Sequence, residues 1–376
     1  MSTSIHRREW LRQSSLAALG LGLSLKSLGN EERLPRSFGS DKGLINLGSN
    51  ENPYGISPKA RQAILDMMGE TNRYQFNIPS LREFAKTLAP YYGITEGNIS
   101  LVPGSGEALG LLSRHFSDGS LVTATPTFFI LPNTSKSLGV KVVEVPLTEG
   151  KVHDLPKMLS AITNDTKMVY ICNPANPTAT ILKSGDLKDF CNEASKKATV
   201  VIDEAYIDFL NPPDNVSMIS LIATNPNIIV LRTFSKIHAM AGLRIGFVAA
   251  HPDTIKKLED NYFRDTQICI SNLTMAGALA SIKDEEHRAS CKQKNEAARN
   301  FTFQELQKLN YHVIPSYTNF IFFNLGNYPG DFSQDMLKKN IILRSNTYPD
   351  GKWGRVSIGT LTEMQQFIKI LKDTKK

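Results

Sequence analysis

The sequence predicts an α/β fold, in which a large domain with a mostly parallel central sheet is followed by a smaller α+β domain. Hydrophobic residues make up 41% of the 376 residues and charged residues 21%, which allows a substantial core and argues against disorder. Short apolar runs alternate with helix-like segments from about residue 99 onward. After about residue 275 the pattern changes to a long polar helical region.

The expected strands of the large domain are Ile99–Val102, Ser120–Ala124, Val140–Val145, Met168–Cys172, Thr199–Ile202, Ile228–Leu231 and Ile245–Ala250. The helices expected between them include Gly106–Phe116, Gly185–Lys197 and Pro252–Asn261. Strands that alternate with helices in this way favour parallel pairing. In such sheets, ligands bind beyond the carboxyl ends of the strands.

The polar helical region, from about Thr274 to Lys308, leads to short apolar runs at 313–315, 319–324 and 356–358. We therefore place the large domain at 76–273 and the C-terminal small domain at 274–376. Residues 31–75 are expected to form an N-terminal arm that also contributes to the small domain.

The first thirty residues have the features of an export signal. Arg7 and Arg8 precede a short, glycine-containing apolar stretch, Ser14–Leu25. This stretch is shorter than the about 20 apolar residues of a membrane-spanning helix, and the paired arginines resemble a twin-arginine signal. We expect export to the periplasm, with membrane contact only through this segment. The alternative is an N-terminal extension on a cytoplasmic enzyme, and no clean A-x-A cleavage pattern fixes the mature start.

Charge and cysteine spacing argue against two kinds of partner. The net charge is +7, but the basic residues are scattered, so we expect no nucleic-acid partner. The four cysteines form no C-x-x-C pair and no zinc-type cluster with histidine. We expect neither a structural disulfide nor a metal site.

Polar or glycine-rich segments follow four of the expected strands. In chain order they are Pro103–Gly106, Asn173–Thr178, Asp203 and Thr233–Lys236. Because the carboxyl ends of parallel strands meet at one edge of a sheet, we expect these segments to share an active-site edge.

The segment around Lys236 suggests the chemistry of that edge. A lysine amine can form a Schiff base with an aldehyde cofactor. Ser235 and Arg244 can hold an anionic group such as a phosphate beside it, and so can the free N–H groups of the helix start at Ser105–Glu107. The alternatives are a surface lysine near an Arg-capped strand and a plain strand-to-helix turn.

Other residues in these segments suit an aromatic, pyridine-type cofactor. Asp203 can pair with a protonated ring nitrogen, which keeps the ring electron-poor. Asn176 and Tyr206 can hydrogen-bond to a phenolate oxygen, and Phe128 can lie flat on the ring. Each also has an ordinary structural alternative: a capping aspartate, a turn asparagine, a half-buried tyrosine and a core phenylalanine.

Taken in order, these segments resemble the fold-type I, pyridoxal-phosphate-dependent aminotransferases of class I/II over about residues 40 to 365. Within them, the chain is most similar to the histidinol-phosphate aminotransferase-like branch. The marks of the resemblance are Asn50–Gly55, Asn72–Tyr74, Asn173–Thr178, Asp203–Asp208, Thr233–Phe247 and Gly354–Thr360. Two positions depart from the family pattern: Ala179 stands where a glycine is usual, and Phe128 where the subgroup often has tyrosine.

The resemblance implies pyridoxal 5′-phosphate as the cofactor. It implies transfer of an amino group between an amino acid, or a phosphorylated amino alcohol such as histidinol phosphate, and a 2-oxo acid. Lys236, Asp203 and Tyr206 would be the catalytic residues, with Lys236 linked to the cofactor as a Schiff base. The other implied cofactor contacts are Ser105, Gly106, Glu107, Phe128, Asn176, Thr233, Ser235 and Arg244.

The resemblance also implies the substrate contacts and the assembly. Arg355 would bind the substrate carboxylate and Arg344 a second anion, while Asn52 and Tyr54 would line the substrate pocket. Tyr74 would reach the cofactor phosphate of a neighbouring subunit, which implies a homodimer with shared active sites.

Two other functions stay open at this point. One is a pyridoxal-phosphate enzyme similar to threonine-phosphate decarboxylase, and the other is a non-catalytic, cofactor-binding regulator. No helix-turn-helix candidate precedes the enzyme-like region, which disfavours the regulator. An export signal also argues against histidinol phosphate, because histidine synthesis is a cytoplasmic pathway.

Overall fold

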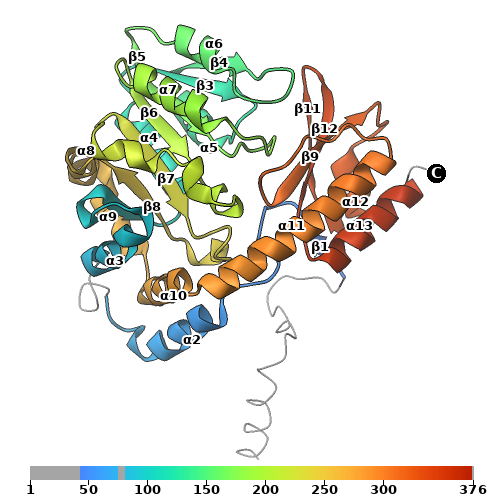
Figure 1. Cartoon of the computed structure of the whole chain (residues 1–376), viewed down its shortest axis with the longest axis horizontal. Coiled ribbons are helices and arrows are strands. Elements are labelled where there is room, and N and C mark those ends of the chain that lie inside the picture. The colour runs from blue at the N-terminus through green and yellow to red at the C-terminus, as the bar shows by residue number, and fades with distance from the viewer. Residues whose placement is uncertain (1–42, 75–80, 375–376) are drawn as a thin grey trace, which may run out of the picture. The chain divides into compact units, whose positions relative to one another are not determined.

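The computed structural model describes residues 43–74 and 81–374 (Figure 1). The described residues from Ile45 onward form one compact unit, and the domain boundaries at residues 76 and 274 stay predictions. The expected export signal lies outside the described residues. Within the described ranges, no helix is both long and apolar enough to cross a membrane.

In the described part of the chain, the central sheet has seven strands in the order β2-β8-β7-β6-β5-β3-β4. Their bounds are β2 Ile99–Val102, β3 Ser120–Thr125, β4 Lys141–Pro146, β5 Thr166–Cys172, β6 Thr199–Asp203, β7 Ile228–Thr233 and β8 Gly246–Ala250. Only β8 is antiparallel to its neighbours, β2 and β7, so β2 points the same way as β5, β6 and β7. The four polar segments therefore meet at one edge, and the predicted mostly parallel α/β fold is confirmed.

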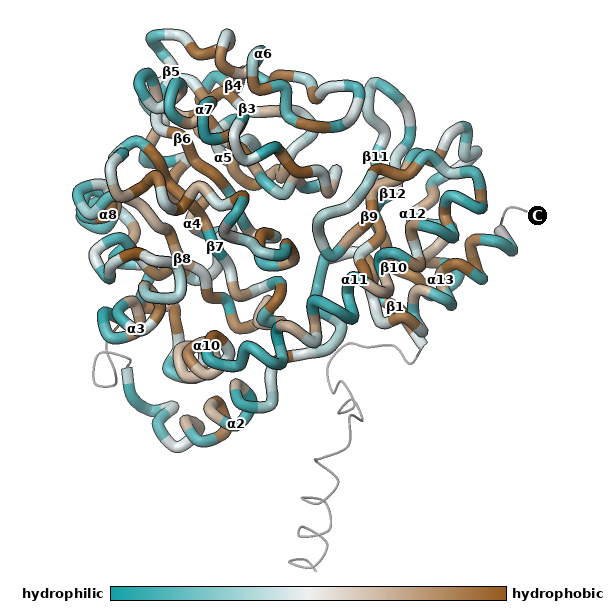
Figure 2. The backbone as a smooth tube through the Cα atoms, in the orientation of Figure 1, coloured by the Kyte–Doolittle hydropathy of each residue, from teal (hydrophilic) through white to brown (hydrophobic). Residues whose placement is uncertain are grey.

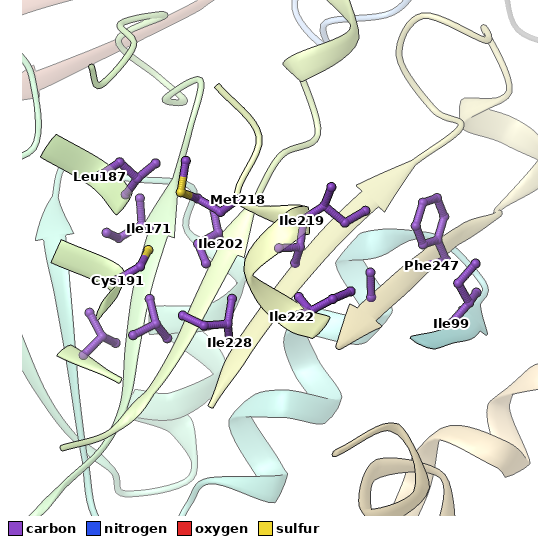
Figure 3. Packing of buried hydrophobic residues seen from close by; sticks show 14 of the residues in the cluster. Ile99, Ile171, Leu187, Cys191, Ile202, Met218, Ile219, Ile222, Ile228 and Phe247 are labelled. Carbon is purple, nitrogen blue, oxygen red and sulfur yellow. The ribbon is translucent and has the colours of Figure 1, made fainter. Parts of the chain in front are cut away.

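Except for the edge strand β4, these strands are largely apolar because helices cover both faces of the sheet. One face packs against α6 (Leu155–Ser160) and α7 (Ser184–Ala194). Figure 3 shows Leu187 and Cys191 of α7 beside Ile171 and Ile202 of the sheet. The other face packs against α4 (Ser105–His115), α5 (Ile130–Ser137) and α8 (Pro252–Leu258).

The sequence located α4, α7 and α8 but missed α5 and α6. Both missed helices are short, with eight and six residues, so neither shows a clear helical period. The expected helix Pro252–Asn261 is also interrupted, because α8 ends at Leu258 and a π-helical turn, Glu259–Phe263, follows it.

The C-terminal part contains an antiparallel sheet in the order β11-β12-β9, formed by Arg344–Tyr348, Gly351–Ser357 and Phe320–Gly326. Its core packs against α11 (Glu285–Lys308) and α13 (Leu361–Thr374). The polar region predicted as one helix is two, because Asp284 separates α10 (Asn272–Lys283) from α11. In the apolar run 313–315, only Val313 pairs, as an isolated bridge to Phe323 of β9.

Figure 2 shows hydrophobic colouring along strands such as β6 and β9 and hydrophilic colouring over much of α11. Apart from short 3-10 turns, the remaining elements of the described residues are β1 Ile45–Asn46, α2 Pro58–Met67, α3 Leu81–Leu88, α9 Arg264–Thr266, α12 Phe332–Leu337 and β10 Ile341–Ile342.

Candidate active site

A cavity of about 790 Å³ lies between the carboxyl edge of the central sheet and one face of the small sheet. The short segment Gly48–Asn50 completes its wall. The sequence-predicted residues that line the cavity are Ser105, Gly106, Phe128, Asn176, Asp203, Tyr206, Thr233, Ser235, Lys236, Arg244, Arg344 and Arg355. Most of the predicted site is therefore brought together in one place.

Four predicted site residues do not line this cavity: Glu107, Asn52, Tyr54 and Tyr74. Glu107 lies exposed in the first turn of α4. The Asn52 amide donates to the backbone oxygen of Ile237 at 2.9 Å instead of facing the cavity. The Tyr54 ring packs in a hydrophobic cluster that includes Ile237, and the exposed fraction of Tyr74 is 69%.

One end of the cavity has the groups that a phosphate needs. Helix α4 begins at Ser105, so its first N–H groups have no partner within the helix. Gly104 has a φ of +89°, and a Cβ added there would lie 2.2 Å from Nη2 of Arg244. The guanidinium thus lies directly against the glycine turn. Ser235 lines the same cavity, and its hydroxyl accepts a hydrogen bond from the Thr233 hydroxyl at 3.0 Å.

We expect Gly104→Ala to weaken binding of pyridoxal phosphate by roughly tenfold or more, because the new methyl group displaces Arg244. Because alanine disfavours this positive φ, the substitution should also lower the free energy of unfolding by about 1–2 kcal/mol. Cofactor titration of the apoenzyme and thermal unfolding measure the two effects. The matched control is Gly110→Ala in the same helix, where a Cβ meets nothing within 4 Å. That variant should gain about 0.5–1 kcal/mol of stability and bind the cofactor normally.

Asp203 ends strand β6 and is 2% exposed. Its Oδ1 accepts a hydrogen bond from the Ala205 N–H at 3.1 Å. Burial raises the pKa of the carboxyl group to about 6, against several groups that lower it. A carboxylate in this position can pair with a protonated ring nitrogen.

Lys236 is half-buried, and its Nζ lies 3.2 Å from the backbone oxygen of Asn50. Burial, followed by the nearby charge of Arg355, lowers the pKa of the amine to about 8. A neutral amine is the form that attacks an aldehyde. The lowered pKa therefore makes this form accessible near neutral pH.

The Tyr206 hydroxyl accepts hydrogen bonds from the amides of Asn176, at 3.2 Å, and Asn50, at 3.0 Å. Asn50 is 1% exposed and was not among the predicted site residues. Asn50 belongs to the segment Asn50–Gly55 that marked the family resemblance, but nothing in the sequence singled it out. Its φ of 53° lies in the left-handed region, which asparagine tolerates. Ala179, which replaces the usual glycine, also keeps a positive φ of 61°. The turn therefore survives the substitution.

Arg355 and Arg344 lie directly opposite each other on the antiparallel strands β12 and β11. The Arg355 guanidinium donates to Asn176 Oδ1 at 2.7 Å and to the Gly48 oxygen at 2.8 Å. Its Nε is buried without a hydrogen-bond partner. Within the described ranges, neither arginine pairs with an acidic side chain. Like charges in opposed positions repel each other, so the pair favours binding of an anion.

Phe128 is half-buried and lines the cavity, with its ring centroid 5.3 Å from that of the exposed Phe129. Among the described residues, no cluster of three histidine, cysteine or acidic side chains is placed to hold a metal ion. All four cysteines are free thiols.

The arrangement fits pyridoxal phosphate. A phosphate cradle, a buried carboxylate and a reactive amine surround a cavity that admits an aromatic ring, which defines the site of a pyridoxal-phosphate-dependent enzyme. The model of the family aminotransferase class I and II matches residues 42–371. A histidinol-phosphate aminotransferase of Brevibacillus brevis is 36% identical over 342 residues, covering 90% of this chain and 92% of that protein. The chain therefore belongs to the class I and II aminotransferases, and its cofactor is pyridoxal 5′-phosphate.

Solved structures agree on the fold. The histidinol-phosphate aminotransferase of Sinorhizobium meliloti, solved in complex with pyridoxal-5′-phosphate, superposes with a TM-score of 0.82 at 23% identity, covering 92% of this chain and 98% of that one. An L-threonine-O-3-phosphate decarboxylase from Porphyromonas gingivalis superposes with a TM-score of 0.74 at 20% identity, covering 88% and 99%. Both likenesses concern the fold alone.

Proposed function

We propose that this aminotransferase acts on amino compounds and 2-oxo acids whose anionic group, a carboxylate or a phosphate, binds at Arg355 and Arg344. The observation that carries the proposal is the opposed pair of arginines in the cavity wall. A 2-oxo acid satisfies Arg355 through its carboxylate. A phosphorylated amino alcohol such as histidinol phosphate, on which the B. brevis relative is named to act, supplies a phosphate to the same pair.

The chain's own residues have distinct roles in this proposal. Bound pyridoxal phosphate supplies an electron-poor ring that accepts electron density from the substrate α-carbon. Lys236 holds and moves the proton of that carbon. Its amine lies in the cavity beside Tyr206, 5.5 Å from the centroid of the tyrosine ring. Asp203 keeps the ring nitrogen protonated, and Asn176 positions both the Tyr206 hydroxyl and the Arg355 guanidinium.

We expect Arg344→Gln to raise KM for a phosphorylated amino substrate by roughly tenfold or more, because one charge-assisted contact is lost. KM for a substrate with a single carboxylate should change by less than about twofold, because Arg355 remains. Steady-state kinetics with both substrates measure the split. Arg114→Gln removes an exposed arginine outside the cavity and serves as the control. An equal change in KM for both substrates would contradict the assignment of Arg344.

A substrate panel separates the remaining alternatives. Half-reactions with histidinol phosphate, common amino acids and phosphothreonine are followed by the visible absorbance of the bound cofactor, by 2-oxo acid formation and by release of carbon dioxide. Amino transfer yields the carbonyl product, whereas a decarboxylase releases carbon dioxide. If no amino compound changes the absorbance, the proposed transfer is wrong.

We also propose that the chain forms a homodimer in which Tyr74 serves the partner's cofactor. The support is the exposure of Tyr74, at 69%, together with exposed Leu65 and Met68 nearby in sequence. Sedimentation analysis tests the dimer. Export by the N-terminal segment is likewise proposed, and cell fractionation with N-terminal sequencing tests it. A monomer, or a cytoplasmic protein that begins near Met1, would contradict the respective proposal.

A further inference from the structure

We propose that Tyr170 is a positioning residue for the reaction: its buried hydroxyl holds Asp203 in the charged, correctly oriented form that pairs with the cofactor ring nitrogen. The inference rests on the cofactor class and not on the identity of the substrate. Tyr170 does not line the cavity, whereas Asp203 does. Tyr170 therefore lies outside the cavity and affects the cofactor only through Asp203.

Strand register explains why the two side chains meet. In the parallel pair β5 and β6, Cys172 lies opposite Asp203, and Tyr170 lies opposite Val201. Because side chains two positions apart share a face, these four residues point to the same side of the sheet. Tyr170 and Asp203 are diagonal neighbours, a separation that a long aromatic side chain can bridge.

The contact is a defined hydrogen bond. The Tyr170 hydroxyl donates to Oδ2 of Asp203 at 3.1 Å, and the Ala205 N–H donates to Oδ1 at 3.1 Å. Each carboxylate oxygen thus has one donor. Tyr170 has no exposed surface, so water does not replace its hydroxyl in this part of the sheet. The two bonds fix the plane of the carboxylate and favour its charged form.

Several titratable groups face Asp203 from the elements packed around it. Tyr170 and Cys172 lie on β5, Glu204 follows on the chain, and Lys236 and Tyr206 line the cavity. Burial raises the pKa of Asp203. Among the groups that lower this pKa, the hydrogen bond from Tyr170 has the largest effect. Burial also raises the pKa of Tyr170 itself, so its hydroxyl keeps its proton and stays a donor.

These contributions determine how the pKa of Asp203 changes when the Tyr170 hydroxyl is lost. Removing the hydroxyl lets burial raise the pKa of Asp203 further, so the carboxyl group holds its proton up to a higher pH. A neutral Asp203 no longer stabilises a protonated ring nitrogen. The loss of function should therefore be largest at low pH and should narrow as pH rises above the new pKa.

The decisive variant is Tyr170→Phe, which keeps the ring and removes only the hydroxyl. Infrared titration of the apoenzyme follows the carboxyl group of Asp203, which is assigned by its disappearance in Asp203→Asn. We expect the midpoint to rise by about one pH unit or more. In the loaded enzyme, kcat should fall with little change in KM, and the deficit should shrink with rising pH. Tyr311→Phe, a change in the separate core around α13, is the control and should leave the midpoint unchanged.

A second variant distinguishes loss of the hydrogen bond from a folding defect. Incorporation of 3-fluorotyrosine at position 170 keeps the hydroxyl and strengthens it as a donor, so the Asp203 midpoint should move down instead of up. An unchanged midpoint in both variants, or a loss of kcat that is equal at every pH, would overturn the proposal. Failure of the substrate proposal would leave the apoenzyme titration unaffected, so the two outcomes are distinguishable.

Discussion

Lys236→Ala is expected to abolish amino transfer and the visible absorbance of the lysine-linked cofactor. The amine is the only lysine nitrogen that lines the cavity within the described ranges. It combines two roles, covalent attachment and proton movement. General acid–base catalysis alone contributes about 10²–10⁴-fold, so we expect kcat to fall by at least about 10⁴-fold when both roles are lost.

Lys236→Arg separates the charge of the side chain from its chemistry, because arginine keeps a cation but does not lose its proton. It should be as inactive as the alanine variant. Lys183→Ala, at the exposed start of α7, is the matched control and should keep normal activity and absorbance. Retention of the visible band and of more than about a tenth of the turnover in Lys236→Ala would contradict the assigned role.

Asp203→Asn should lower kcat by roughly 10²–10³-fold while the protein stays folded. The amide has nearly the same shape as the carboxylate but carries no charge, so the ring nitrogen loses its partner. Burial makes this loss severe, since Asp203 is 2% exposed and little water screens the site. Kinetics and the affinity for pyridoxal phosphate, measured separately, report the charge effect.

The control for this prediction is Asp208→Asn, a nearby carboxylate that pairs with Arg232 at 3.4 Å outside the cavity. It should affect stability more than catalysis. If Asp203→Asn and Asp208→Asn lower kcat to the same degree, a general disturbance of the loop after β6, and not the lost charge, explains the effect.

The sequence predicted the central sheet because all of its strands except the edge strand β4 are buried on both faces. Continuous apolar runs such as Thr199–Ile202 are therefore visible without any structure. Strand β11 was missed for the opposite reason: its sequence, Arg-Ser-Asn-Thr-Tyr, is polar and mostly exposed, as an edge strand permits. The short helices α5 and α6 offered too few residues for a period to emerge.

The site was predictable where its residues follow strand ends in the chain. The positions of Asp203 and Lys236 in the cavity wall were predicted in this way. Asn50 and Tyr170 were not, because their roles depend on contacts through space. Tyr170 stands in an apolar run and has the pattern of an ordinary core residue. Only the register of β5 against β6 brings its hydroxyl to Asp203.

The hydrogen bonds of Asn50 have a consequence for how the enzyme matures. Asn50 N–H donates to the hydroxyl of Ser357 at 2.8 Å, across 307 positions of the chain. The same asparagine supports Tyr206 and accepts from Lys236, so the pocket is complete only when the two ends of the catalytic region have met. Such distant contacts are slow to form. A nascent or partly folded chain therefore lacks a finished cofactor site, and we expect capture of pyridoxal phosphate to report that the segments around Asn50 and Ser357 have come together.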